Sequence, residues 1–128
     1  MDRIFRVRNG AGARHVIERE GDLFWLDGDV FGDYRAGERV APTGLTFLAP
    51  VTPTKIVAIG LNYKGHAAEM NKPLPAEPLM FIKPSTAVIG PEEPIRLPPG
   101  VGEIHYESEM AVVIRRTASR VKAAAAPA

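Results

Sequence analysis

Cysteine is absent from this sequence of 128 residues. Its absence excludes disulfide bridges, thiolate metal sites and a cysteine nucleophile. Long apolar runs are also absent, because no stretch approaches the ~20 apolar residues that are needed to span a bilayer. Residues 1–10, MDRIFRVRNG, lack the apolar core of a secretory signal peptide. We therefore expect a cytoplasmic protein with no membrane partner.

An excess of charge of one sign is missing as well. The chain has 16 Lys and Arg residues against 15 Asp and Glu residues, so its net charge is +1. The basic residues are scattered among acidic ones, which gives no reason to expect a nucleic-acid partner. A hydrophobic content of 45% with 24% charged residues is typical of a globular protein.

The first fifty residues alternate short apolar stretches with turn signals. RIFRVR is followed by Asn9-Gly10, and LFWLD is followed by Gly28, in the pattern of strands joined by tight turns. We predict a small β-rich domain over residues 1–50. Three aromatic side chains are expected in its core: Phe24, Trp25 and Phe31.

Residues 48–55, LAPVTPTK, contain two prolines and are expected to link this domain to a second one, which spans residues 51–128. The second domain is predicted to contain strands at 55–60, 79–82, 87–89 and 104–114. A short helix is expected over 63–70, with Asn62 as its N-cap. The alanine-rich tail is typical of the start of a helix.

The predicted strand at 104–114 carries IHYESEM before an apolar run. Because alternate residues of a strand share a face, His105, Glu107 and Glu109 are expected to point the same way. Two neighbouring carboxylates repel each other, and a hard cation such as Mg²⁺, Mn²⁺ or Ca²⁺ would compensate, whereas Zn²⁺ would suit this oxygen site poorly. The alternative is a strand end whose two glutamates are hydrated.

His66 and Glu69 are three residues apart, which places them on one face of the predicted helix. A carboxylate beside an imidazole raises its basicity, so His66 is a candidate general base. The alternative is an ordinary surface pair. Three further residues are candidates for substrate contact and are equally compatible with hydrated surface positions: Asn62, Tyr63 and Lys83.

Three segments in this order, VAIGLNYKGHAAEM, EPLMFIKPSTAVIGP and IHYESEMAVVI, resemble the fumarylacetoacetate hydrolase family. The first fifty residues resemble the small β-rich domain that precedes the catalytic domain in the bacterial branch of 2-hydroxyhepta-2,4-diene-1,7-dioate isomerases. The resemblance implies a mainly β protein: a small β-rich domain, then the first part of a mixed β-roll or β-sandwich catalytic domain.

The resemblance also implies chemistry for the candidate residues. Glu107 and Glu109 match two carboxylates that bind Mg²⁺ or Mn²⁺ in the family, and His66 with Glu69 matches its His–Glu dyad. Lys83 matches a lysine at the edge of the site. The implied activity is hydrolysis, decarboxylation or tautomerisation of small 2-oxo or 1,3-dioxo acids. The implied intact enzyme is a homodimer.

Two departures from the family pattern stand out. Leu61 occupies a position where many relatives have arginine. The family's third metal-binding carboxylate would follow Glu109 at a distance that carries it past Ala128. We therefore expect the sequence to stop inside its second domain. The alternative to a metal-dependent enzyme is a truncated, inactive fragment of one.

Overall fold

The computed structural model describes residues 2–10 and 12–126. Its internal contacts divide the chain into two compact units, Met1–Pro94 and Ile95–Ala128. Most of the regular structure lies in the first unit, which contains two separate sheets. The domain boundary expected near residue 50 stays a prediction.

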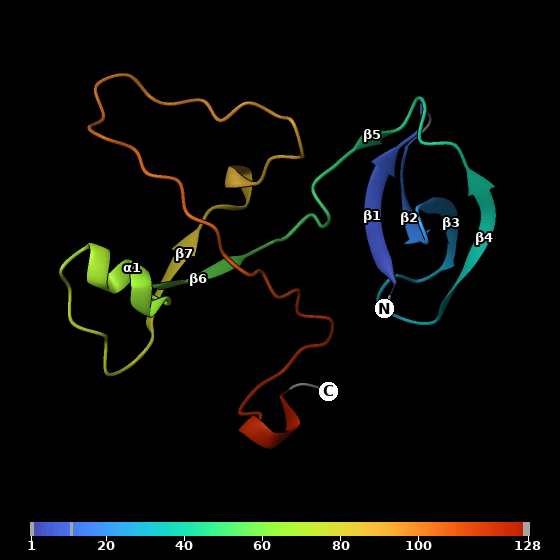
Figure 1. The fold of residues 1–128 in the computed structure, drawn as a ribbon. Coiled ribbons are helices and arrows are strands. Elements are labelled where there is room, and N and C mark those ends of the chain that lie inside the picture. The colour runs from blue at the N-terminus through green and yellow to red at the C-terminus, as the bar shows by residue number, and fades with distance from the viewer. Residues whose placement is uncertain (1, 11, 127–128) are drawn as a thin grey trace. The chain divides into compact units, whose positions relative to one another are not determined.

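The first sheet is antiparallel, and its strands follow the order β4-β3-β2-β1-β5 (Figure 1). Sequential hairpins form most of it, because β1 pairs with β2, β2 with β3 and β3 with β4. The strands joined by tight turns that the sequence predicted for this region are therefore confirmed. Its strands are β1 (Arg3–Arg8), β2 (Ala13–Arg19), β3 (Asp22–Gly28), β4 (Tyr34–Val40) and β5 (Thr46–Phe47).

Glycine is required at the end of β3. Gly28 has a φ of +112°, a left-handed conformation that L side chains rarely adopt. A Cβ atom at this position would also lie 2.3 Å from the backbone carbonyl oxygen of Asp33. The tight turn between β3 and β4 therefore has no room for any other residue.

The core of this sheet consists of aliphatic side chains from its central strands. Val7, Val16 and Ile17 have exposed fractions of 0%. Trp25 is half-buried and packs against the cluster that contains Val16, as predicted. The prediction for Phe31 was wrong, because its side chain is 41% exposed. Phe31 lies in the β3–β4 loop, where no strand carries its side chain into the sheet.

The chain that leaves β5 is attached to the sheet by polar contacts. The backbone N–H of Leu48 donates to the carbonyl oxygen of Arg6 at 2.8 Å. The Arg6 guanidinium in turn donates to the carbonyl of Ala49 at 3.5 Å. Burial and the Arg6 charge lower the pKa of His15, and a hydrogen bond to the backbone of Pro50 opposes this shift. This segment, which begins at residue 48 and is called the connector below, is thus held against β1 and β2.

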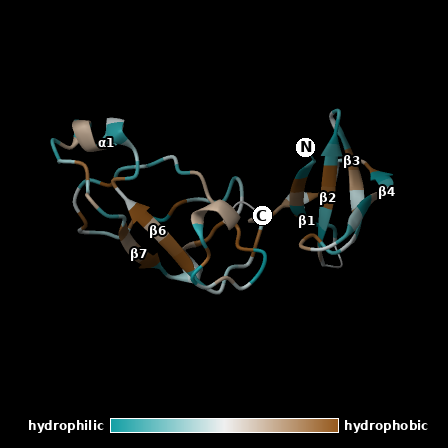
Figure 2. Ribbon diagram, turned by 90° about the horizontal axis from the view of Figure 1, so that it is seen from below, coloured by the Kyte–Doolittle hydropathy of each residue, from teal (hydrophilic) through white to brown (hydrophobic). Residues whose placement is uncertain are grey.

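The second sheet contains two antiparallel strands, β6 (Ile56–Gly60) and β7 (Leu79–Lys83). Both strands were predicted from their β-branched and apolar residues. Figure 2 shows that β6 and β7 are strongly hydrophobic. All five residues of β7 are exposed, however, so among the described residues no further layer buries its side chains.

The predicted helix after β6 forms as α1 (Lys64–Glu69). The prediction that Asn62 caps it was wrong: Tyr63 occupies the N-cap position and no side chain caps the helix. Asn62 lies one residue too early to reach the first free backbone N–H groups. Leu61, between β6 and the helix, has a left-handed φ of +50°.

Two predicted strands do not form. Ala87 ends a 3₁₀ turn, Ser85–Ala87, and no strand of the described residues pairs with residues 87–89. Residues 104–114 have no regular structure, because among the described residues no neighbouring strand supplies hydrogen-bond partners. The alanine-rich tail forms one 3₁₀ turn, Ala123–Ala125.

No helix within residues 2–10 and 12–126 is long and apolar enough to cross a membrane.

Candidate functional site

Helix α1 brings His66 and Glu69 together, at the helical spacing that the sequence predicted. The Nδ1 atom of His66 lies 3.5 Å from the Oε2 atom of Glu69. The imidazole is 34% exposed, whereas the carboxylate is 78% exposed. A carboxylate beside Nδ1 favours the tautomer that carries its proton there, which makes Nε2 the proton-accepting nitrogen. The pair therefore has the arrangement of an oriented base that solvent can reach.

Asn62 and Tyr63 lie directly before this helix, and both side chains are exposed. Lys83 is the last residue of β7, and its Nζ lies 5.5 Å from the centre of the Phe81 ring. The register pairs Lys83 with Ile56 at the start of β6.

The ladder register separates these candidates along the sheet. Lys83 lies at the end where β6 begins, and α1 follows the opposite end, where Gly60 pairs with Leu79. Four residue steps along a strand correspond to about 13 Å. The sheet alone therefore does not direct Lys83 and the helix pair to one point.

Glu107 and Glu109 belong to the second unit, Ile95–Ala128, and both residues are exposed. Because no strand forms there, the strand alternation that would align them on one face is not present. Two carboxylates fit a hard divalent cation by their oxygen chemistry. The described residues, however, contain no group of three or more His, Cys, Asp or Glu side chains that could hold a metal.

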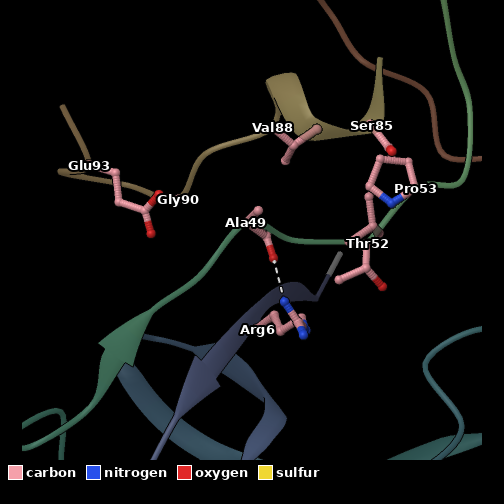
Figure 3. Close-up of a pocket in the computed structure, with 9 residues that line it drawn as sticks. Arg6, Ala49, Thr52, Pro53, Ser85, Val88, Gly90 and Glu93 are labelled. Carbon is pink, nitrogen blue, oxygen red and sulfur yellow. Dashed lines mark hydrogen bonds between the residues drawn. The ribbon is translucent and has the colours of Figure 1, made fainter. Parts of the chain in front are cut away.

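Sequence reasoning missed a cavity of about 270 Å³ in the first unit (Figure 3). Arg6 and Glu93 supply its two charged side chains, and the connector and the 3₁₀ turn supply smaller ones. No pattern in the sequence indicated it, because its walls come from segments that are distant in the chain. Its lining residues are Arg6, Ala49, Val51, Thr52, Pro53, Ser85, Val88, Gly90 and Glu93. None of the predicted site residues lines this cavity.

Residues 55–128 match the family model described as the C-terminal domain of fumarylacetoacetate hydrolase. The chain belongs to the fumarylacetoacetate hydrolase family. The match covers more than half of the chain and includes every candidate site residue. The resemblance of the three ordered segments is therefore confirmed as family membership.

Two relatives show how similar this chain is to other proteins and how much of their length it covers. An uncharacterized protein of Archaeoglobus fulgidus is 45% identical over 108 residues, which are 84% of this chain and 40% of that protein. The human mitochondrial oxaloacetate tautomerase FAHD2A is 45% identical over 80 residues, which are 62% of this chain and 26% of the human protein. This chain thus spans less than half of the length of either relative.

A solved family structure has the same fold over most of this chain. The 2-hydroxyhepta-2,4-diene-1,7-dioate isomerase of Mycobacterium marinum superposes with a TM-score of 0.63 and 29% identity. The match covers 78% of this chain and 39% of the isomerase. The mainly β fold expected from the sequence is confirmed, and this chain corresponds to less than half of the isomerase chain.

Proposed function

We propose that this family member catalyses proton transfer on a small 2-oxo or 1,3-dioxo acid, with tautomerisation as its reaction. The observation that carries the proposal is the contact between His66 and Glu69 in a chain of this family. Relatives named as an oxaloacetate tautomerase and as a dienedioate isomerase support this reaction type over hydrolysis.

His66 is the base in this proposal. Its Nε2 atom removes a proton from the carbon next to the substrate carbonyl, and the C–H electron pair moves into the enolate. The same nitrogen then returns the proton to the enolate oxygen, so that no atom is gained or lost. Glu69 orients the ring and favours the tautomer that carries its proton on Nδ1, which leaves Nε2 as the proton acceptor.

Glu107 and Glu109 would hold a divalent cation, Mg²⁺ or Mn²⁺, because carboxylate oxygens are the ligands that these ions prefer. A bound cation supplies a positive charge that stabilises enolate oxygens. Lys83 adds a cationic side chain that suits a carboxylate substrate, and Asn62 and Tyr63 supply neutral hydrogen-bonding groups. We further propose a cytoplasmic location, as the sequence led us to expect, and a homodimeric intact enzyme.

A second candidate is that the 128-residue chain is catalytically inactive on its own. One observation favours it: the described residues contain no group of three or more His, Cys, Asp or Glu side chains that could hold a metal. In this case metal binding and turnover require protein segments that this chain does not contain.

The test starts from the enol form of oxaloacetate with Mg²⁺ and measures how fast its absorbance disappears when the purified chain is added, because the reverse conversion passes through the same enolate. His66→Asn is expected to lower kcat by about 10² to 10⁴ if the imidazole transfers the proton. His105→Asn is the matched control, because it removes an exposed histidine outside the helix pair. Equal rates for the wild-type chain and both variants would refute His66 as the base.

Metal binding is measured separately, by titrating Mn²⁺ and following the electron paramagnetic resonance signal of the free ion. Glu109→Gln is expected to weaken binding at least tenfold, because it removes one charged ligand. Glu103→Gln, a neighbouring exposed acid, is expected to change binding little. If the wild-type chain binds no Mn²⁺ and turns over no substrate, the inactive-chain candidate replaces the enzyme proposal.

A further inference from the structure

Two opposite charges line the cavity of about 270 Å³ in the first unit (Figure 3). Arg6 contributes a cation from β1, and Glu93 contributes an anion from the loop that follows the 3₁₀ turn. None of the ion pairs in the described part of the chain includes either side chain. Both charges are therefore available to a ligand.

Arg6 is suited to hold a carboxylate. It is half-buried, and the one side-chain hydrogen bond that it makes within the described residues, to the carbonyl oxygen of Ala49, is 3.5 Å long. A guanidinium carries five N–H donors, so most of them stay unused. A carboxylate accepts two parallel hydrogen bonds from arginine and neutralises a charge that is partly withdrawn from water.

A close backbone approach keeps Glu93 beside the same cavity. A Cβ atom added to Gly90 would lie 3.2 Å from the Oε1 atom of Glu93 and 3.3 Å from the backbone nitrogen of Ala49. The loop that carries Glu93 thus lies against the connector residue whose carbonyl oxygen accepts from Arg6. This contact brings the anion and the cation to one cavity.

The remaining lining is small and mixed in polarity. Thr52 and Ser85 supply hydroxyl groups, and Val51, Pro53 and Val88 supply apolar surface. A volume of about 270 Å³ lies just below the range of pockets that hold drug-sized ligands, so it suits a molecule with few heavy atoms.

We propose that this cavity binds a small zwitterion, namely an amino acid with a short side chain. Its carboxylate pairs with Arg6, and its ammonium group pairs with Glu93. A simple anion would be repelled by Glu93 and a simple cation by Arg6, so the two charges together select a ligand that carries both. The proposal is independent of the proton-transfer site, because no residue of that site lines the cavity.

The experiment titrates L-alanine into the full ¹⁵N-labelled chain and follows the backbone amide resonances by NMR. The amides of Thr52 and Gly90, which line the cavity, are expected to shift, whereas the amide of Gly37 in β4 is not. Propionate and ethylammonium each carry one of the two charges of alanine. Each is expected to bind at least tenfold more weakly than alanine does.

Variants of the two charged residues test the selection. Glu93→Gln is expected to weaken alanine binding at least tenfold, yet to bind propionate more tightly than the wild type does, because the repulsion between negative charges is gone. Glu92→Gln is the matched control, because Glu92 is an exposed neighbouring acid that does not line the cavity. Arg6→Gln should weaken the binding of both alanine and propionate, whereas Arg8→Gln, on the same strand, should change neither. Because Arg6 also contacts the connector, the Glu93 variant decides the result if Arg6→Gln alters the whole spectrum.

Three outcomes would overturn the proposal. Cavity amides that do not shift with alanine would mean that the cavity takes no small zwitterion. Equal affinities of the wild type for alanine and propionate would mean that Glu93 plays no part in selection. Equal weakening in Glu93→Gln and Glu92→Gln would mean that net charge, rather than the cavity, controls binding.

Discussion

Ile17→Ala is expected to destabilise the first sheet strongly. Ile17 is 0% exposed and lies in the central strand β2, opposite Ile4 on one side and Phe24 on the other. The substitution removes three carbon atoms, each worth about 0.8 kcal/mol of burial, or about 2.4 kcal/mol in total. A residual cavity adds to this loss, so we expect the free energy of unfolding to fall by about 2.5–4 kcal/mol.

Urea unfolding measures this change, and the fluorescence of Trp25 reports it. Trp25 is the only tryptophan of the chain and lies in β3 of the same sheet. Ile95→Ala is the matched control, because the same atoms are removed from a side chain that is 75% exposed. We expect the control to change stability by less than about 0.5 kcal/mol. Similar losses for both variants would refute the packing argument.

Three further predictions concern the same sheet. Gly28→Ala is expected to lower the free energy of unfolding by about 1–3 kcal/mol, measured in urea, because its Cβ would clash with the carbonyl of Asp33 in a left-handed conformation. Arg14→Ala should cost about 0.5–1 kcal/mol and shift the emission of Trp25, since the guanidinium lies 4.1 Å from the ring centre; unchanged emission would contradict this contact. Because its pKa is lowered in the folded state, His15 contributes stability above its unfolded pKa of 6.5 and loses it as the pH falls below that value. The free energy of unfolding of a His15→Gln variant should therefore fall less between pH 7.5 and pH 5 than that of the wild type. An identical fall in both proteins would contradict the lowered pKa of His15.

Local patterns correctly predicted most of the regular structure. The hairpins of the first sheet follow from alternating side chains and from glycines at tight turns, both of which act over a few residues. Strands β6 and β7 follow from apolar, largely β-branched runs, and α1 follows from the residues between them. The contact of His66 with Glu69 was predictable for the same reason, since one helical turn determines it.

The errors lie where a residue's environment depends on distant segments. Residues 104–114 have strand-forming composition, but a strand exists only when a second strand supplies hydrogen-bond partners. Phe31 has the composition of a core residue, but the β3–β4 loop holds it at the surface, where it is 41% exposed. The prediction of Asn62 as the N-cap was wrong because the helix begins one residue later than the pattern indicates.

By itself, the sequence determined the family, the mainly β class and the residue types available for proton transfer and cation binding. These properties depend on short, ordered motifs that can be recognised from the order of the residues, without knowledge of the fold. Only the tertiary structure decided that, within the described residues, the predicted carboxylate strand has no strand partner and that all five residues of β7 are exposed. Both depend on which segments meet in space, because backbone pairing and burial are properties of two partners rather than of one segment.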